Sequence, residues 1–487
     1  MGYDSCPRFA LIDDVLVEKI IDEAFDVLER VGVFVEHTEA ESLVMDHNGR
    51  RRPGSRAVLI PRDLTERSVQ SSPSTFRLFD TTGTKTFIVG GDNVHYDPGS
   101  AALKIHDSSQ NDQRPAATAD LIRFHGLTEK LEHFHFQSTG LVSSDVPEAI
   151  QDAYRLYIAL QFCRKPVVTG LFVEEGLHPM VEMLAAVRGG ERALRAKPLA
   201  IFDACPSAPL RWSNLTTWSV LECARRGIPS EFIAVPLAGA TGPVTLAGSL
   251  VQHAAENLAG IVIAQCVAPG APVVFGGSPA IFDMRSGSTP LGAIESVMLN
   301  AGHVQIGKRL GLPTHAYLGL SDAKSSDAQA GLESAVGTFI AALSGINVAS
   351  GGGMLDFESC QSLEKLTIDN DICGMAYRFL EGIVQRSAPM ALDLLSEVGH
   401  ESNFLGLSHT REWYRREQFF PAIIDRGNVD QWRRAGKPTL ADRSSLRVSE
   451  LLGDGPTPVI TEEAQREMQG IMLTHARKAG MEHLPVA

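Results

Sequence analysis

Residues 251–277, VQHAAENLAGIVIAQCVAPGAPVVFGG, contain the pattern that decides the fold. Residues 251–267 are apolar at helical spacing. A Pro-Gly break follows, and residues 272–277 form a short β-rich run that ends in two glycines. A helix that leads into a short apolar strand is typical of parallel βαβ units. This stretch therefore predicts an α/β protein.

The same succession of strand, break and helix recurs from about residue 130 onwards. We expect strands at 134–139, 166–172, 198–203, 231–236, 272–277, 313–319, 345–350 and 400–406. Their starts lie about 30 to 55 residues apart, enough for a strand, a crossover helix and two loops. Eight such units predict a TIM-type (β/α)₈ barrel, although a doubly wound open sheet gives the same alternation.

The regions on either side of the repeats differ in pattern. Residues 1–130 begin with an amphipathic helix at 13–31 and continue with short strand-like runs, which predicts an N-terminal α+β layer. Residues 131–410 would form the barrel. Residues 411–487 are rich in charged helical segments, and we expect them to form a C-terminal helical extension packed on the barrel.

Composition excludes several classes of function. Of the 487 residues, 58 are acidic and 44 basic, which gives a net charge of -14 and no broad basic surface for nucleic acid. No run approaches the roughly 18 apolar residues of a membrane span, and the first residues lack the pattern of a secretion signal. Seven scattered cysteines indicate reduced thiols. We therefore expect a cytoplasmic protein.

Common catalytic and cofactor motifs are missing. The sequence has no GxGxxG after the early strands, no GxxxxGK[ST] and no GxSxG, which removes the main support for dinucleotide, nucleoside triphosphate and serine hydrolase chemistry. It also lacks HExxH and cysteine pairs at ligand spacing. We expect no metal site.

The loop at residues 319–327, GLSDAKSSD, carries the most chemistry at the expected carboxyl rim. Lys324 lies between Asp322 and Asp327, so it could form a loop-shaping ion pair with either carboxylate. The alternative is a Schiff-base nucleophile, which would make the protein a lyase or aldolase. The ion pair is favoured because Schiff-base lysines usually lie in dry pockets within a barrel strand.

Aromatic residues gather near the expected strand ends. Converging rings could hold a quaternary ammonium ion through their π faces, although core packing would also explain them. The candidates are Tyr96, Phe172, Phe202, Phe275 and Tyr317. His315, on the same expected strand as Tyr317, could line a pocket or be a hydrogen-bonded core residue.

Residues 242–277 closely resemble the trimethylamine methyltransferase family of corrinoid-dependent enzymes. The resemblance continues through 282–295, 311–331, 343–356, 362–375 and 397–406. It implies a TIM-type barrel that holds a methylamine at its carboxyl mouth while a separate corrinoid protein presents cobalt(I). The corrinoid-binding signature DxHxxG is missing, so the resemblance implies that the cobalamin is supplied by that partner and is not bound permanently here.

One position departs from the family pattern. Family members that use trimethylamine carry pyrrolysine between the glycine and the Ser-Asp-Ala-Lys of the loop, and this chain has Leu320 there. A quaternary amine is already charged and leaves as a neutral tertiary amine without proton transfer, so Leu320 is compatible with such a substrate. The resemblance thus points to the branch without pyrrolysine, which acts on glycine betaine and related compounds.

The resemblance also suggests roles for particular residues, without naming a catalytic group. A betaine carboxylate would need donors, for which Arg285, His315, His135 and the backbone amides of residues 350–353 are candidates. The residues expected to shape the mouth are Ser321, Asp322, Lys324, Asp327, Gly351 and Gly352. A homo-oligomer is compatible with these expectations. The remaining alternative to an enzyme is a non-catalytic betaine-binding protein.

Overall fold

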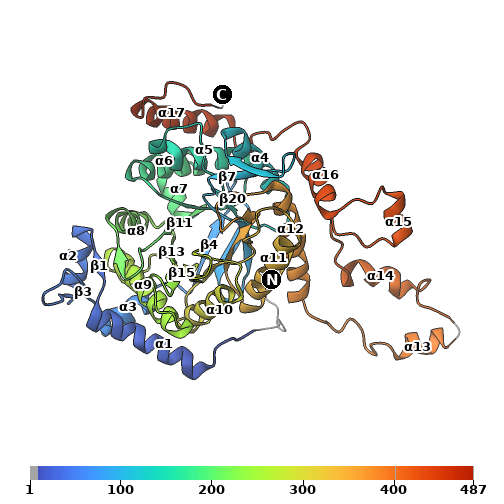
Figure 1. The fold of residues 1–487 in the computed structure, drawn as a ribbon, viewed down its shortest axis with the longest axis horizontal. Helices are drawn as coiled ribbons and strands as arrows, with labels where there is room; N and C mark the ends of the chain where they lie inside the picture. Colours follow the sequence, from blue (N-terminus) through green and yellow to red (C-terminus); the bar gives the residue numbers. More distant parts are fainter. Residues whose placement is uncertain (1–8, 401, 486–487) are drawn as a thin grey trace.

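Eight short parallel strands lie at the centre of the computed structural model, which describes residues 9–400 and 402–485 (Figure 1). They are β6 (His95–Pro98), β9 (Gln137–Ser138), β10 (Val167–Gly170), β11 (Ala200–Ala204), β13 (Ser230–Ala234), β15 (Val273–Gly277), β17 (His315–Tyr317) and β18 (Val348–Gly352). The protein has an α/β fold, as expected from residues 251–277.

The pairing of these strands runs in a closed cycle. Strands β9, β10, β11, β13 and β15 pair in that order, and β17, β18 and β6 form a second parallel group. Parallel bridges between Phe275 and Thr314 and between Tyr96 and Phe134 join the two groups. We call this arrangement the strand ring.

Seven of the strands lie where the sequence predicts them, and one prediction is wrong. Residues 402–406 and His400 form no strand, and Glu401 lies outside the described residues. The place in the ring is taken by β6, from the region expected to form the N-terminal layer. Its sequence, HYDP, looks polar, but all four residues are buried. Asp97 can be buried because Ser350 donates a hydrogen bond to it inside the ring.

Helices surround the strand ring. They are α4 (Thr118–Lys130), α5 (Gln151–Phe162), α6 (Leu177–Arg188), α7 (Glu191–Ala196), α8 (Asn214–Arg226), α9 (Leu246–Val267), α10 (Ile294–Arg309), α11 (Ala328–Ser344) and α12 (Leu363–Leu380). Helix α9 is buried along most of its length because α1 (Asp14–Asp26) and α3 (Arg62–Ser71) cover its outer face.

The amino ends of the ring strands are closed by a hairpin of β4 (Thr75–Phe79) and β5 (Thr86–Gly90). Leu78 and Val89 of this hairpin pack against the lowest inward-facing residues of the ring, which are Phe136, Val168, Ile201, Val274 and Val348. Burying each such side chain stabilises the fold by about 1.5 to 3 kcal/mol. The hairpin therefore leaves the opposite, carboxyl end as the place for a site.

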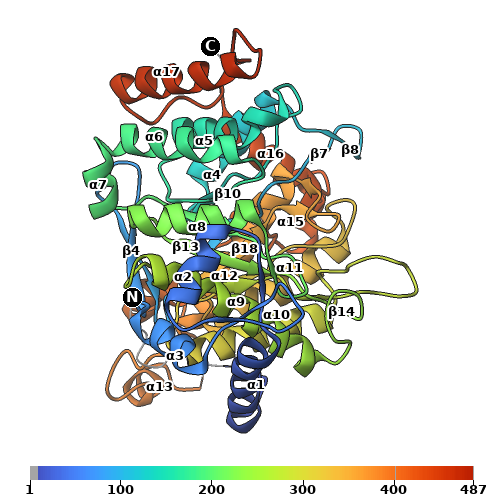
Figure 2. The same cartoon turned by 90° about the vertical axis from the view of Figure 1, so that its left-hand side faces the viewer.

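The loops at the carboxyl end contain further short strands (Figure 2). These are β7 (Lys104–Asp107), β8 (Asp112–Pro115), β14 (Leu237–Ala238), β16 (Ala280–Ile281), β19 (Met354–Leu355) and β20 (Cys360–Gln361). They fix loops that would otherwise be free to move.

The two terminal regions pack differently. Near the N-terminus, α2 (Thr38–Asp46) lies against α8 and α9, with short strands β1 (Phe34–Val35), β2 (Arg50–Arg51), β3 (Val58–Leu59) and β12 (Arg211–Trp212) beside it. At the other end, α16 (Leu440–Leu452) packs on α12, and α17 (Glu462–Lys478) packs on α6. In contrast, α13 (Leu392–Val398), α14 (Ser408–Glu417) and α15 (Val429–Arg434) extend away from the body (Figure 1).

Candidate active site

Polar side chains from five strands point into the ring on the carboxyl side of the apolar residues that pack against the β4–β5 hairpin. We call those apolar residues, Phe136, Val168, Ile201, Val274 and Val348, the apolar plug. The polar side chains are Asp97 of β6, Asp203 of β11, Glu231 of β13, His315 of β17 and Ser350 of β18. Successive residues of a strand face opposite sides, so a residue two positions beyond a plug residue also faces inward. In β11, Ile201 belongs to the plug and Asp203 follows it on the same face.

A hydrogen-bond chain orders part of this interior. Ser350 Oγ donates to Asp97 Oδ1 at 2.8 Å, and His315 Nε2 lies 3.0 Å from Ser350 Oγ. Burial lowers the pKa of His315 to about 3, so the imidazole is neutral at pH 7. The Ser350 hydroxyl donates its one hydrogen bond to Asp97, so it accepts a hydrogen bond from His315 Nε2–H.

Three acids of the ring, Asp97, Asp203 and Glu231, hold their protons more tightly than usual. Burial raises the pKa of Asp203 to about 7 and raises the pKa values of Asp97 and Glu231 well above their usual range. The Asp203 charge raises the pKa of Glu231 further, so Glu231 is the acid of this pair that keeps its proton. Neither oxygen of Glu231 has a hydrogen-bond partner, and Asp203 Oδ1 also lacks one.

Tyr317 lies among these acids. Its ring meets that of His315 edge-on, with 4.9 Å between centroids. Burial raises the pKa of Tyr317, and the charges of Asp203, Glu358, Asp97 and Glu231 raise it further. Burial also raises the pKa of Glu358 to about 8. We call Asp97, Asp203, Glu231 and Glu358 the acidic cluster.

One buried guanidinium stands beside this cluster. Arg155 of α5 is 1% exposed and forms an ion pair with Asp152 at 3.2 Å. Its Nη2 donates to the carbonyl of Gly170 at 2.7 Å, and its Cζ lies 4.9 Å from the centre of the Phe172 ring. Asp152 Oδ2 accepts from the amide of Phe172 at 2.6 Å. The start of α5 therefore fixes the loop that follows β10.

The five aromatic candidates do not converge. Tyr96 donates from its hydroxyl to the Thr338 carbonyl at 2.9 Å, on the outside of the ring. Phe202 and Phe275 also face the surrounding helices, because the neighbouring residues on each strand face inward. Tyr317 alone faces the acidic cluster, and Phe172 lies on the loop after β10 with 63% of its surface exposed.

Two proposed carboxylate donors lie elsewhere. The ring of His135 stacks on Tyr377 at 5.0 Å and lies beside Phe87 of the hairpin, at the amino end. The side chain of Arg285 is 93% exposed and reaches Asp283 at 3.3 Å. Of the side chains proposed as donors, the structure places His315 within the polar interior.

The loop after β17 is tightly ordered. Leu320 is 3% exposed and packs beside Gly351, where a Cβ would lie 3.1 Å from the Leu320 Cβ. Gly351 has φ +126°, which favours glycine, and a Cβ on Gly352 would meet the Phe134 ring at 2.5 Å. Both glycines are therefore needed for the close approach of β18 to its neighbours.

The charged residues of this loop bind backbone groups. Asp322 accepts from the amides of Leu291 and Gly292. Asp327 caps the start of α11. Lys324 donates to the carbonyl of Asp322, and its ion pair, at 3.6 Å, is with the carboxylate of Asp356.

Ser321 completes the loop. Its Oγ donates to Glu333 Oε2 at 2.6 Å, and the same oxygen accepts from the amide of Asp322. The side chain of Lys324 is 60% exposed, which gives it no dry environment for Schiff-base chemistry. The expected ion pair with Asp322 or Asp327 is therefore corrected to one with Asp356.

Sequence reasoning missed Asp97, Asp203, Glu231, Glu358 and Arg155. Two of them had a visible signal, because Asp203 and Glu231 are single charges in otherwise apolar strands. Charged residues are rarely buried without a partner or a function. Arg155 gave no such signal, since arginine is common in helices.

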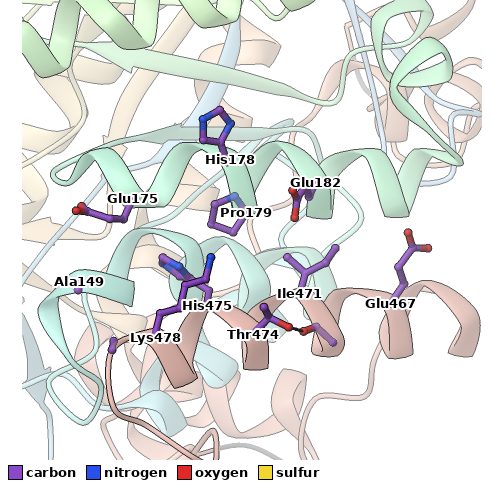
Figure 3. A pocket seen from close by; sticks show the side chains of 12 residues that line it. Ala149, Glu175, His178, Pro179, Glu182, Glu467, Ile471, Thr474, His475 and Lys478 are labelled. Atoms are coloured by element: carbon purple, nitrogen blue, oxygen red, sulfur yellow. Dashed lines mark hydrogen bonds between the residues drawn. The ribbon is translucent and has the colours of Figure 1, made fainter.

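A groove of about 860 Å³ lies outside the strand ring, between α6 and α17 (Figure 3). Glu182 and Glu467 stand on its opposite walls (Figure 3). It receives no side chain from the ring strands, so it is separate from the polar interior. Within residues 9–400 and 402–485, no three metal-ligating side chains converge, and no helix has the length and apolar character to cross a membrane.

The sequence was then compared with known proteins. The family model for trimethylamine methyltransferase matches residues 3–481. The chain belongs to the trimethylamine methyltransferase family. It is therefore a methyltransferase.

Individual members of the trimethylamine methyltransferase family extend this result. The chain is 28% identical to the glycine betaine methyltransferase of Desulfitobacterium hafniense, over 98% of this chain and 99% of that protein. It is 30% identical to the trimethylamine methyltransferase of Methanosarcina thermophila, over 91% of this chain and 93% of that one.

A solved structure supports the fold. The monomethylamine methyltransferase of Methanosarcina barkeri aligns with a TM-score of 0.50 and 12% sequence identity, over 99% of this chain and 90% of that one. At this identity the likeness shows the fold alone.

Proposed function

We propose that this family member has a (β/α)₈ barrel and removes a methyl group from a small quaternary amine of the betaine class. The methyl group passes to cobalt(I) of a corrinoid protein, which is a separate partner and supplies the cobalamin. The similarity to a glycine betaine methyltransferase along nearly the whole of both chains supports this substrate class. Leu320, in place of pyrrolysine, supports it too.

The acidic cluster around Tyr317 is the observation that carries the proposal. A quaternary ammonium ion cannot donate hydrogen bonds and is held by negative charge and aromatic faces. Asp203 Oδ1 and Glu358 Oε1 are buried without a hydrogen-bond donor, which leaves both oxygens available to face a cation. Solvent reaches part of Asp203, so a small cation can approach the cluster from the carboxyl end.

The reaction needs little acid or base chemistry. The electron pair of cobalt(I) forms the new bond to the methyl carbon, the C–N pair returns to nitrogen, and a neutral tertiary amine leaves. The protein must hold the ammonium ion and keep water away from it. The chain from His315 through Ser350 to Asp97 fixes the floor of the site, and Tyr317 presents its ring above that floor.

A large partner also needs a surface on which to dock. Four exposed apolar side chains lie on loops that follow different ring strands: Leu103 after β6, Phe172 after β10, Val244 after β13 and Met284 after β15. All four lie on loops at the carboxyl end of the ring, where a docking partner would bury them. We propose that the corrinoid protein docks on these loops, where the ordered loop 320–327 shapes the entrance.

The test is a substrate panel. The purified protein is mixed with cob(I)alamin and, in separate reactions, glycine betaine, carnitine, choline, trimethylamine and dimethylglycine, and methylation of the corrinoid is followed by its absorption spectrum. We expect turnover with at least one quaternary compound and none with dimethylglycine. Binding of a betaine without any transfer would favour a non-catalytic binding protein. Borohydride trapping of a carbonyl compound on Lys324 would favour a lyase.

A further inference from the structure

Arg155 has an unused donor beside the acidic cluster. The ion pair with Asp152 and the bonds to the carbonyls of Gly170 and Thr139 engage both terminal nitrogens, but the buried Nε–H has no acceptor. Leaving such a charged donor unpaired is costly, and guanidinium N–H groups match carboxylate oxygens well. An anion is the complementary ligand for this nitrogen.

Asp203 supplies the opposite pole. Its Oδ1 is buried without a donor, and Arg155 lowers the pKa of its carboxyl through charge attraction. The two side chains are nevertheless not within 4 Å of each other, because Arg155 makes its ion pair with Asp152. A positive and a negative side chain therefore both lie beside Gly170 without forming an ion pair with each other.

Gly170 separates the two poles. Its carbonyl accepts from Arg155 Nη2 at 2.7 Å, while a Cβ built on it would lie 3.1 Å from Asp203 Cβ and 3.6 Å from Oδ2. The glycine thus leaves room beside Asp203 that any other residue would fill. It lies at the carboxyl end of β10, where solvent reaches it.

Two aromatic rings flank this region. Phe172 covers the guanidinium of Arg155, and the charge of Asp203 raises the pKa of the Tyr317 hydroxyl. An aromatic face beside a carboxylate suits an ammonium ion whose methyl groups block hydrogen bonding. The arrangement therefore offers one place for a methylated cation and another, next to it, for an anion.

We propose that Arg155 and Asp203 are the two poles of a zwitterion site, in which Arg155 Nε–H binds the substrate carboxylate and Asp203 faces its quaternary ammonium group. This inference rests on the proposed function and narrows its substrate class to amino-acid betaines, as opposed to choline or tetramethylammonium. Arg155 thereby replaces Arg285 as the carboxylate donor.

Calorimetry with matched ligands tests the two poles separately. Glycine betaine carries both charges, tetramethylammonium carries only the cation, and 3,3-dimethylbutanoate keeps the carboxylate and the shape but replaces the charged nitrogen with carbon. We expect glycine betaine to bind at least about tenfold more tightly than either of the others, the size of one charge-assisted hydrogen bond or more.

Variants then assign each pole. Arg155→Lys keeps the charge and the Asp152 partner but loses Nε–H, so it should weaken glycine betaine binding by about tenfold while leaving tetramethylammonium unchanged. Asp203→Asn should weaken both cations and spare 3,3-dimethylbutanoate. Gly170→Ala places a methyl group beside Asp203 and should weaken both cations without removing a charge. The control is Arg67→Gln, which removes an exposed arginine of α3 that pairs with Asp63.

The outcomes separate this inference from the proposed function. If tetramethylammonium bound as tightly as glycine betaine and Arg155→Lys changed neither, the zwitterion site would be wrong while quaternary amine demethylation could stand. A loss of glycine betaine binding in Arg285→Gln alone would also overturn it. If no quaternary compound bound or was demethylated, the proposed function itself would fail. If Arg155→Lys does not fold, the zwitterion site is still tested by the affinity of Gly170→Ala and by the comparison of the three ligands with the wild-type protein.

Discussion

Nε2 of His315 lies 3.4 Å from Oε1 of Glu231, and both side chains are fully buried inside the strand ring. The contact does not make an ion pair at pH 7, because burial lowers the pKa of His315 and raises that of Glu231. The negative charge available to a cation is therefore that of Asp203, while Glu231 is protonated. This assignment leads to an asymmetry that can be measured.

Glu231→Gln and Asp203→Asn should differ in effect. The glutamine is close in shape to a protonated glutamic acid, so Glu231→Gln should change the Kd for a quaternary ammonium ligand less than threefold, or about 0.6 kcal/mol. Asp203→Asn removes the charge and should raise Kd by about tenfold or more. Calorimetry at pH 8 measures both values. Equal losses in the two variants would contradict the assignment of the proton to Glu231.

Ligand binding should depend on pH through Asp203. Burial raises the pKa of this carboxyl to about 7, so it is largely protonated at pH 6 and largely ionised at pH 8. Cation affinity should therefore rise between pH 6 and pH 8, and Asp203→Asn should flatten that rise. Titrations across this range check both curves. A wild-type affinity that falls with rising pH would exclude Asp203 as the cation partner.

The same shift has a consequence for stability. The unfolded chain has an aspartate pKa of about 3.9, so the folded state binds this proton more tightly. A raised pKa means that the stabilisation is complete below about pH 3.9 and is lost as pH rises through about 7. Between pH 5 and pH 8, the free energy of unfolding should fall by about 2 to 3 kcal/mol more in the wild type than in Asp203→Asn. Urea denaturation measures this difference, and parallel pH curves would contradict it.

Tyr317 and Phe275 provide a matched pair of aromatic substitutions. Tyr317 faces the acidic cluster, so Tyr317→Leu should weaken binding of a quaternary ammonium ligand by about 0.5 to 2 kcal/mol. Phe275 packs against His253 outside the ring, so Phe275→Leu should lower thermal stability and leave the Kd unchanged. The reverse pattern would return Phe275 to the site and remove Tyr317 from it.

The buried pair of Lys365 and Asp369 should be a stability element. Its atoms lie 2.6 Å apart, and both side chains are at most 2% exposed. Lys365→Met leaves the Asp369 charge without its partner and should cost about 3 to 5 kcal/mol. The double variant Lys365→Met with Asp369→Leu should recover part of that loss in the same denaturation experiment. A single variant as stable as the wild type would show that the pair is not needed.

Strand and helix patterns predicted the fold better than the site. Seven ring strands were visible as apolar runs with breaks, because the cores of parallel sheets are buried on both faces. Strand β6 was hidden, since HYDP carries an aspartate that only the folded ring supplies with a partner, Ser350. Period alone also could not tell which face of β11 or β15 points inward, so Phe202 and Phe275 were expected at the mouth.

The polar site depends on contacts between distant segments. Arg155 and Gly170 lie on different elements, and their hydrogen bond cannot be foreseen from spacing. The same holds for Lys324, whose carboxylate partner is Asp356 and not a neighbour in its own loop. Family resemblance indicated the chemistry, but the side chains that line the polar interior were identified only from the structure.

The most direct test of the central claim follows the methyl group itself. Glycine betaine labelled with ¹³C in its methyl groups is incubated with the enzyme and cob(I)alamin, beside an equal concentration of unlabelled trimethylamine. We predict labelled methylcobalamin and dimethylglycine in a ratio of about one to one, as the transfer of a single methyl group requires. Unlabelled methylcobalamin with dimethylamine, and unchanged betaine, would contradict the account.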